Sequence, residues 1–340
     1  MSRCLQLAAK GLGTVSPNPM VGCVIVCGDK IIGEGYHRKC GEAHAEVNAV
    51  NSVQDKSLLS KSTMYVSLEP CAHVGRTPAC ADMIIRENIP EIIIGSTDPY
   101  FLVAGKGIQI LESASRKVVT GILEDECIEL NKRFYSFHQK KRPYIILKWA
   151  ETKDGFVDYI RTPGTDSKAS WITNEDCKTL VHKWRTEEDA FLVGTNTVIL
   201  DDPQLTARKW AGKNPLRVSI DEHNNLSRSY KIFDKQAKTL IFNSLSDYID
   251  DNIEFVKADF SKDIIPQILS SLYDRQILSL VVEGGSQTLQ NFINSGLWDE
   301  ARVFTGNQNF GTGLCAPKFS ATAQKTEVIG DSELRWYFKG

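Results

Sequence analysis

Apolar positions recur along the chain in two alternating patterns: short continuous runs typical of buried strands, and longer stretches with helical spacing. In the first half these patterns predict strands at 21–27, 30–36, 63–68, 91–95 and 117–119. Helices are predicted over 2–12, from about 43, near 80–88, near 105–113 and from about 124 to 138. Strands and helices that alternate at these lengths indicate an α/β fold with helices on both faces of a sheet.

The second half repeats this alternation. Strands are predicted at 144–150, 189–194, 216–220, 239–243, 253–257, 279–283 and 300–305, and helices near 174–187, 263–275 and 286–295. A basic segment, His138 to Arg142, ends at Pro143 directly before the first of these strands, and a charged segment of this kind is usually a solvated linker. We therefore predict two domains, residues 1–143 and 144–340.

The composition is that of an ordinary globular protein. A chain of 340 residues has enough material for two hydrophobic cores. Its net charge of -2 predicts no basic surface for general nucleic-acid binding, and no apolar run is long enough to span a membrane. The 9 cysteines, an odd number at irregular spacing, fit a reducing compartment better than a disulfide framework. We expect a cytoplasmic protein that binds neither nucleic acids nor membranes.

Three residues in the first half could bind one metal ion. His44, Cys71 and Cys80 offer an imidazole and two thiols, which can occupy three corners of a zinc tetrahedron and leave the fourth for water. Glu46 stands two residues after His44, where its carboxylate could move protons. Because residues i and i+2 point in different directions inside a helix, His44 and Glu46 could share a site only near a helix's first turn. Cys80 also stands at a predicted helix start, and the dipoles of two helix N-termini would favour thiolates.

The order His-x-Glu, then Pro-Cys, then a later Cys is the signature of the zinc nucleobase deaminases. Their common form is Cys-x-x-Cys, whereas 8 residues separate Cys71 from Cys80 here. Two alternatives stay open at this point. The two cysteines could be small buried hydrophobic residues, as we expect for the other seven, or the site could bind zinc for structure alone. A structural site would need a fourth protein ligand and would have no use for Glu46.

Four stretches resemble the deaminase half of the bifunctional riboflavin-biosynthesis deaminase-reductase family. They are Ser16 to Val24, His44 to Glu46, Pro70 to Cys80 with Gly-Arg-Thr-Pro inside it, and Asp98 to Gly107. The long Cys-x8-Cys spacing is specific to that family among zinc deaminases. The resemblance implies a cytidine-deaminase-like three-layer domain in which Glu46 is the proton shuttle and zinc is bound by His44, Cys71 and Cys80.

The same resemblance implies a substrate, a pyrimidinone bearing a ribose 5-phosphate, that contacts Asn18, His37, Arg76 and Asp98. Taken alone, Arg76 could be a solvated arginine and His37 a hydrogen-bonded turn histidine. The family commonly has Asn-Pro after the Asp-Pro pair, whereas this chain has Tyr100 and Phe101. An amide contact expected at position 100 therefore cannot be made in the same way.

The second half lacks the Gly-x-Gly-x-x-Gly fingerprint of dinucleotide-binding folds. It has instead a predicted strand that runs into Gly284 and Gly285, followed by a helix start at Ser286. Backbone amides without side chains, together with a helix dipole, can contact a phosphate group there. Alone, this pattern is equally compatible with a glycine turn that caps a helix.

Further stretches resemble, in order, the reductase half of the same family: Lys148 to Ala150, Trp171 to Thr173, His182 to Arg185, Val193 to Val198, and Asp201 to Arg208. The resemblance implies a dihydrofolate-reductase-like domain that uses NADPH. It places Lys148, Arg185, Leu205, Arg208 and Glu283 on the substrate side, and Ala150, Trp171, Thr197, Asp201, Gly285 and Ser286 on the cofactor side. The family usually has a substrate-binding serine two residues before the tryptophan, where this chain has Ala169. Either Ser167 or Ser170 could replace it.

The leading hypothesis is a two-step enzyme, with zinc-dependent deamination followed by NADPH-dependent reduction of one phosphorylated pyrimidine, acting as a homo-oligomer. A second hypothesis is a nucleic-acid base deaminase with an accessory domain, which the near-neutral charge and the absence of a basic aromatic groove disfavour. A third is a non-catalytic protein with structural zinc, which the presence of Glu46 disfavours.

Overall fold

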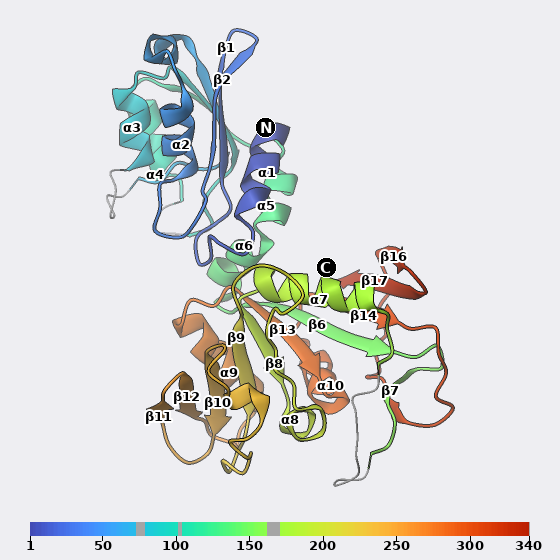
Figure 1. Ribbon diagram of the computed structural model, residues 1–340. Helices are drawn as coiled ribbons and strands as arrows, with labels where there is room; N and C mark the ends of the chain where they lie inside the picture. Colours follow the sequence, from blue (N-terminus) through green and yellow to red (C-terminus); the bar gives the residue numbers. More distant parts are fainter. Residues whose placement is uncertain (73–78, 101–103, 162–170, 340) are drawn as a thin grey trace. The chain divides into compact units, whose positions relative to one another are not determined.

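The computed structural model describes residues 1–72, 79–100, 104–161 and 171–339. They form two compact units, Met1–Lys141 and Arg142–Gly340, and the division falls inside the basic segment of the sequence. Each unit has its own sheet, as the ribbon in Figure 1 shows. Buried apolar side chains form a separate hydrophobic core in each. None of the helices in the described ranges combines the length and the apolarity needed to cross a bilayer.

The first unit is built on a five-stranded sheet of order β2-β1-β3-β4-β5. Its strands are β1 (Gly22–Cys27), β2 (Lys30–Tyr36), β3 (Thr63–Leu68), β4 (Glu91–Ser96) and β5 (Lys117–Val119). β1 and β2 form the predicted antiparallel hairpin, in which Gly28 takes the positive φ that the turn requires, and β3, β4 and β5 run parallel. The ends of β3 and β4 are therefore adjacent, and the residues that follow them meet at one edge of the sheet.

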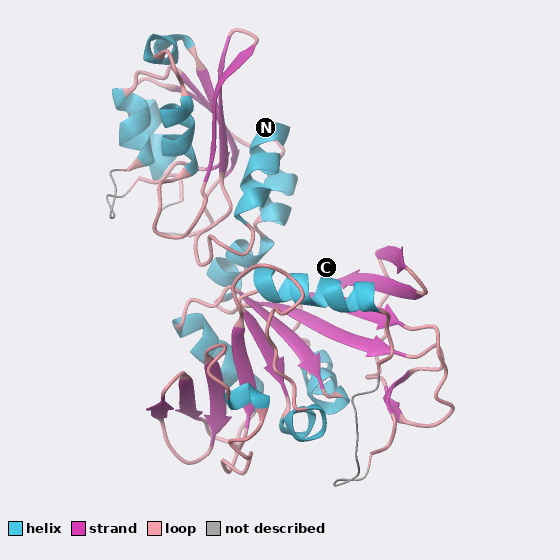
Figure 2. Ribbon diagram, in the orientation of Figure 1, coloured by secondary structure: helices cyan, strands magenta, loops and turns pink. Residues whose placement is uncertain are grey.

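Helices cover both faces of this sheet, which gives the predicted three layers. They are α1 (Ser2–Ala8), α2 (Ala45–Ser52), α3 (Cys80–Arg86), α4 (Lys106–Ser113), α5 (Glu124–Leu130) and α6 (Lys132–Lys140). α2, α3 and α4 lie on one face, and α1 and α5 lie on the other (Figures 1 and 2). Buried side chains from α2 and α3, among them Ala49 and Ile84, pack on Ile25, Met64 and Val66 of the sheet.

The single closing helix predicted from about 124 to 138 is wrong in one respect, because the chain forms two helices divided at Asn131. This residue is 2% exposed and has φ -101° and ψ 19°. Its side-chain amide accepts a hydrogen bond from the backbone N–H of Met20 at 2.8 Å and donates one to the Met20 carbonyl at 2.9 Å. The partner lies 111 residues earlier, so no local pattern around Asn131 reveals the break.

The second unit is built on a ten-stranded sheet of order β11-β12-β10-β9-β8-β13-β6-β14-β17-β16. Seven of its strands were predicted: β6 (Tyr144–Glu151), β8 (Ala190–Val193), β9 (Leu216–Ile220), β10 (Thr239–Asn243), β12 (Ile253–Lys257), β13 (Ser279–Gly284) and β14 (Glu300–Thr305). These seven run parallel and are largely buried. The carboxyl ends of β8, β13 and β6 are neighbours, and loops at such ends are where ligands bind in α/β sheets.

The sequence analysis missed several elements, most of them short or exposed. They are β7 (Phe156–Asp158), α8 (Thr195–Asp201), β11 (Tyr248–Asp250), β15 (Leu314–Cys315), β16 (Lys325–Ile329) and the longer, partly buried β17 (Ser332–Phe338). β11 and β15 are fully exposed, and β16 is mostly so, because they lie at sheet edges or pair in a two-stranded sheet. Polar residues are tolerated at such positions, so the apolar pattern that marks a strand is missing.

Two hydrophobic cores lie on the two faces of the larger sheet. On one face, α9 (Ile264–Asp274) and α10 (Ser286–Asn294) contribute Ile268, Leu272 and Phe292. On the other, α7 (Glu175–Glu187) contributes Cys177 and Trp184. In Figure 1 α7 crosses the sheet on the face opposite α10. The predicted helices of this half are thus present within one residue of their predicted ends.

Candidate functional site

Three side chains of the first unit converge on a position that could hold a metal ion. The Nδ1 atom of His44 lies 3.6 Å from the Sγ atom of Cys71 and 3.4 Å from that of Cys80. The three donor atoms all lie within 4.8 Å of one another. A zinc ion bound by two thiolates at about 2.3 Å and one imidazole at about 2.0 Å needs donors at this mutual spacing. One imidazole and two thiols are also the donor set that zinc prefers, so the residues present fit the ion.

Local structure places each donor at the start or end of an element. His44 is the N-cap residue of α2, and Cys80 is the first residue of α3, as the sequence predicts. Cys71 follows β3 by three residues, and its Sγ atom accepts a hydrogen bond from the backbone N–H of Cys80 at 3.3 Å. The contact with the Cys80 thiol, followed by the contact with His44 and this backbone bond, lowers the pKa of the Cys71 thiol against the effect of burial. A thiol that ionises readily is ready to bind a metal.

Glu46 lies in the first turn of α2, two residues after His44, and is 3% exposed. Burial, and the nearby Cys71 thiolate, raise the pKa of Glu46 to about 7. A carboxylate with such a pKa can take up and release a proton near neutral pH. The geometry expected for an i and i+2 pair at a helix start is therefore present in the structure.

Asn18 and His37 lie next to the metal-binding residues. The side-chain amide of Asn18 donates to Nε2 of His37 at 3.1 Å, while Nδ1 of His37 lies 3.2 Å from the carbonyl of Ala43, to which it donates. The two bonds fix one tautomer of His37. Its ring meets that of His44 edge to face, with centroids 5.5 Å apart. The structure thus brings these two predicted substrate residues to the same site. The His37 ring is hydrogen-bonded on both nitrogens, as expected for a turn histidine.

Glu69 is a residue of this site that the sequence analysis missed. It is 4% exposed, and its carboxylate accepts hydrogen bonds from the backbone N–H groups of Asp98, Gly105, Gly107 and Ile108, at 3.3, 3.0, 2.9 and 3.4 Å. It therefore fixes the loop between β4 and α4 beside Cys71. Its position directly before Pro70-Cys71 was the only local signal, because the groups that it binds lie about 30 to 40 residues later in the chain.

Asp98 and Tyr100 lie in the loop that Glu69 holds. Asp98 accepts a hydrogen bond from the backbone N–H of Tyr100 at 2.8 Å, and the Tyr100 ring contacts His138, with centroids 5.0 Å apart. Tyr100 therefore packs against His138, at the position where the family commonly has an asparagine. The prediction for Arg76 lies outside the described residues.

In the second unit, Glu283 holds two cations at the carboxyl end of β13. Its Oε2 atom lies 3.1 Å from Nη2 of Arg185 on α7, and its Oε1 atom lies 3.8 Å from Nζ of Lys148 on β6. Burial lowers the pKa of Lys148, and Glu283 partly offsets this effect. The Nε atom of Arg185 and Oε1 of Glu283 are buried without a hydrogen-bond partner among the described residues. Buried polar atoms without partners are expected where a polar ligand binds.

Leu205 and Arg208 lie in the segment after α8, beside this cluster. Arg185 donates from Nη1 to the carbonyl of Thr206 at 3.2 Å, and the Nδ1 atom of His182 accepts from the backbone N–H of Arg208 at 3.1 Å. The sequence analysis gave His182 no role. Burial, with Arg185 and Arg208 nearby, lowers the pKa of His182 to about 4, so the ring is neutral and can accept this bond.

Four of the predicted cofactor residues gather at the carboxyl ends of β6, β8 and β13. Ala150 is the penultimate residue of β6, Thr197 lies in the first turn of α8 after β8, and Gly285 and Ser286 begin α10 after β13. A Cβ atom on Gly285 would stand 3.3 Å from Oγ1 of Thr197, so bare backbone faces this hydroxyl. Adjacent strand ends, bare backbone and a helix start fit the phosphates of a nicotinamide dinucleotide.

The other two cofactor residues are engaged elsewhere in the unit. Asp201 pairs with Arg161, with Oδ1 and Nη1 2.8 Å apart. Trp171 is 66% exposed, and its ring lies under the ammonium of Lys178 at 3.6 Å. The exposed indole is available to a bound ligand. Asp201 would contact a ligand only as part of its ion pair with Arg161. Ala169, Ser167 and Ser170 lie outside the described residues.

Comparisons with known proteins agree with this arrangement. Residues 143–327 match the family described as the RibD C-terminal domain, and residues 1–96 match the cytidine and deoxycytidylate deaminase zinc-binding region. The riboflavin biosynthesis protein RibD of Actinobacillus pleuropneumoniae is 40% identical over 341 residues, which cover 97% of this chain and 86% of that protein. RibD of Aquifex aeolicus is 38% identical over 322 residues, which cover 92% of this chain and 88% of that protein.

Among solved structures, a diaminohydroxyphosphoribosylaminopyrimidine deaminase/5-amino-6-(5-phosphoribosylamino)uracil reductase from Thermotoga maritima is similar to this chain. It is 35% identical, the match covers 100% of this chain and 97% of that one, and the TM-score is 0.89. An Acinetobacter baumannii RibD structure matches with 30% identity, 99% and 97% coverage and a TM-score of 0.89.

A cytidine-deaminase-like unit with a zinc site, joined to a dihydrofolate-reductase-like unit, defines a bifunctional deaminase and reductase that uses Zn²⁺ and NADPH. The chain belongs to the RibD family of riboflavin biosynthesis proteins. The two activities of the leading hypothesis, zinc-dependent deamination and NADPH-dependent reduction, are therefore confirmed over the nucleic-acid deaminase.

Proposed function

We propose that the chain acts twice on one phosphorylated pyrimidine. Residues 1–143 deaminate 2,5-diamino-6-(5-phosphoribosylamino)pyrimidin-4(3H)-one, and residues 144–340 then reduce the ribosyl group to ribityl with NADPH. The observation that carries the proposal is the convergence of His44, Cys71 and Cys80, with buried Glu46 directly behind them. The names of the similar proteins support the choice of substrate.

In the deamination, His44, Cys71 and Cys80 hold zinc, which as a Lewis acid makes water a better nucleophile. Glu46 accepts a proton from the attacking water at its carboxylate as the oxygen adds to the ring carbon that bears the amine. Glu46 then returns the proton to the amine, which leaves as ammonia. Its pKa of about 7 suits both transfers. Asn18, His37, Arg76 and Asp98 orient the substrate.

In the reduction, bound NADPH would supply the hydride that reduces C1 of the ring-opened ribose. Arg185 and Arg208 bind the 5-phosphate through charge-assisted hydrogen bonds, and Leu205 lines the substrate side. Lys148 holds a proton at Nζ beside Glu283. This proton is available to the ribosyl group as that group is reduced. Ala150, Trp171, Thr197, Asp201, Gly285 and Ser286 lie on the cofactor side. Either Ser167 or Ser170 takes the place of the serine absent at position 169.

Zinc content and two separate assays of Glu46→Gln test the proposal. The substitution keeps the size of the side chain but removes its ability to carry a proton. Ammonia release should fall by roughly 10²- to 10⁴-fold while zinc stays bound and NADPH oxidation with the deaminated intermediate is unchanged. Glu129→Gln, on the exposed side of α5, is the matched control. Full ammonia release by Glu46→Gln would defeat the proposal.

We further propose a cytoplasmic, homo-oligomeric enzyme. Support for the location comes from the nine cysteines, none of which forms a disulfide. The oligomeric state stays a prediction, which light scattering on the purified chain measures directly.

A further inference from the structure

Arg208 needs help to meet a phosphate in one fixed orientation. Its guanidinium donates from Nη1 to two neutral oxygens, Oε1 of Gln204 at 2.8 Å and Oγ1 of Thr206 at 3.0 Å. Among the described residues, no carboxylate forms an ion pair with it, and partial burial together with nearby Arg185 lowers its pKa. A long side chain on the surface loses rotamer entropy when a ligand fixes it. Neutral acceptors that fix it beforehand reduce this cost and leave its charge for the ligand.

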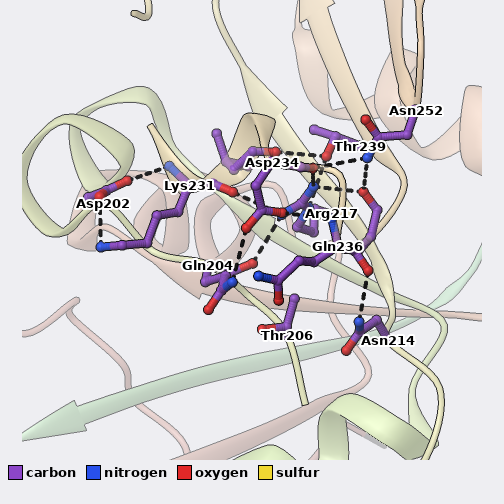
Figure 3. Close-up of polar contacts among 12 residues, drawn as sticks. Asp202, Gln204, Thr206, Asn214, Arg217, Lys231, Asp234, Gln236, Thr239 and Asn252 are labelled. Atoms are coloured by element: carbon purple, nitrogen blue, oxygen red, sulfur yellow. Dashed lines mark hydrogen bonds and ion pairs between the residues drawn. The ribbon is translucent and has the colours of Figure 1, made fainter. Parts of the chain in front are cut away.

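The orientation of the Gln204 amide is set by Asp234. The Nε2 atom of Gln204 donates to Oδ2 of Asp234 at 2.9 Å (Figure 3). A carboxylate can only accept, so it requires the NH₂ side of the amide. The carbonyl side, Oε1, is thereby turned to Arg208. Reversal of the amide would place an NH₂ group against the guanidinium and set the amide carbonyl against the Asp234 carboxylate.

Asp234 is itself held by a fully buried cation. Arg217 of β9 is 0% exposed, and its Nη1 atom lies 2.7 Å from Oδ1 of Asp234. The remaining donors of Arg217 bind the hydroxyl of Thr239 at 2.9 Å and the carbonyls of Lys231, Asp234 and Ala237 at 3.0, 2.6 and 2.7 Å. Figure 3 shows this guanidinium at the centre of the contacts. Because Arg217 is buried and β9 lies inside the sheet, its guanidinium is fixed. The ion pair with Arg217 in turn fixes the position of the Asp234 carboxylate.

The backbone around Leu205 is fixed by two arginines. Leu205 has φ +54°, which is uncommon for a residue with a side chain, and is 1% exposed. Nη1 of Arg217 lies 3.4 Å from the carbonyl of Gln204, just before it, and Nη1 of Arg185 lies 3.2 Å from that of Thr206, just after it. The segment that carries Arg208 is thus held after Leu205 by Arg185 and before Leu205 by Arg217.

We propose that Arg217, Asp234 and Gln204 are positioning residues that act in series to orient the guanidinium of Arg208 toward the 5-phosphate of the substrate. The inference rests on the proposed role of Arg208 in substrate binding and adds residues that do not touch the substrate. The polarity of the series is fixed at each step: Arg217 donates to Asp234, Gln204 donates to Asp234, and Arg208 donates to Gln204.

The test uses Gln204→Met in the full-length enzyme, because methionine has a similar shape and no hydrogen bonds. With the deaminated phosphoribosyl intermediate as substrate, KM in the NADPH oxidation assay should rise roughly two- to tenfold, as expected for one lost hydrogen bond, with kcat within twofold. Gln236→Met is the matched control, since Gln236 is exposed in the same loop as Asp234. Its KM should be unchanged.

A double-variant cycle separates this inference from the role on which it rests. If Gln204 acts through Arg208, Gln204→Met should add nothing to the KM of Arg208→Gln. Additive effects, or an unchanged KM in Gln204→Met, would overturn the series. An unchanged KM in Arg208→Gln would overturn the proposed role of Arg208 and the series with it.

Asp234→Asn is a second variant that keeps the size of the side chain, should Gln204→Met fold poorly. Its amide can offer a carbonyl to Arg217 and an NH₂ group to Gln204, which would reverse the Gln204 amide. KM should rise as in Gln204→Met, with thermal unfolding recorded in parallel. A lower unfolding temperature with unchanged KM would show a structural role only and would contradict the inference.

Discussion

Arg185 and Glu283 lie 98 residues apart in sequence, yet their Nη2 and Oε2 atoms are 3.1 Å apart at the carboxyl end of β13. Glu283 is thereby held toward α7, while its second oxygen faces Lys148 on the neighbouring strand at 3.8 Å. The carboxylate links a residue proposed to bind the phosphate to one proposed to hold a proton. Its removal should therefore affect both the pH dependence and the affinity of the reductase.

Glu283→Gln should move the alkaline limb of the reductase pH profile to lower pH. Glu283 raises the pKa of Lys148, which burial lowers, so its loss lowers that pKa further and Lys148 gives up its proton at a lower pH. The measurement is the rate of NADPH oxidation against pH. Glu254→Gln, which breaks a surface pair with Arg275, is the control. A limb that stays in place would exclude Lys148 as the titrating group.

His182→Asn should make the second unit less sensitive to acid. The pKa of His182 is about 4 when folded and near the ordinary 6.5 when unfolded. Between these values the unfolded chain binds a proton that the folded chain does not, so stability is lost as the pH falls from about 6.5 to about 4. The loss is roughly 1–3 kcal/mol.

Denaturant unfolding of wild type and His182→Asn across this pH range measures the effect. The unfolding free energy of wild type should approach that of His182→Asn as the pH falls. The reason is that asparagine keeps an acceptor for the Arg208 N–H but does not titrate. His223→Asn, at an exposed position, is the control. Parallel curves for wild type and His182→Asn would contradict the assignment.

Glu69→Ala should destabilise the first unit by roughly 2–4 kcal/mol, since four backbone N–H groups lose their acceptor. Zinc affinity and ammonia release should fall with it, because the loop beside Cys71 loses its anchor. Calorimetry and metal titration measure the two effects. Glu112→Ala, exposed on α4, should leave both unchanged. Equal stabilities of the two variants would be evidence against this role of Glu69.

Removal of zinc with a chelator should abolish ammonia release and leave NADPH oxidation of the deaminated intermediate unchanged. The reason is that His44, Cys71 and Cys80 all lie in the first unit, whereas the proposed reductase residues lie in the second. Added zinc should restore ammonia release. Loss of both activities on chelation would place the metal requirement in the second unit as well.

The parts of the molecule that the sequence predicted are those with local signals. Parallel buried strands carry continuous apolar runs, and His44, Cys71 and Cys80 stand in a spacing that few chemistries share. Glu69 and His182 were missed because their partners, loop N–H groups and the backbone of Arg208, come together only in the folded chain. The helix break at Asn131 was missed for the same reason, since its partner lies 111 residues earlier. The edge strand β16 was missed because it is mostly exposed and carries no apolar pattern.

The most direct measurement supplies the diaminopyrimidinone ribosyl phosphate to the enzyme with NADPH and follows ammonia and NADPH separately. We predict one ammonia for each NADPH oxidised, with ammonia appearing first, and no NADPH oxidation from this substrate by Glu46→Gln. Ammonia release without any NADPH oxidation, or NADPH oxidation by Glu46→Gln at the wild-type rate, would contradict two consecutive reactions on one substrate.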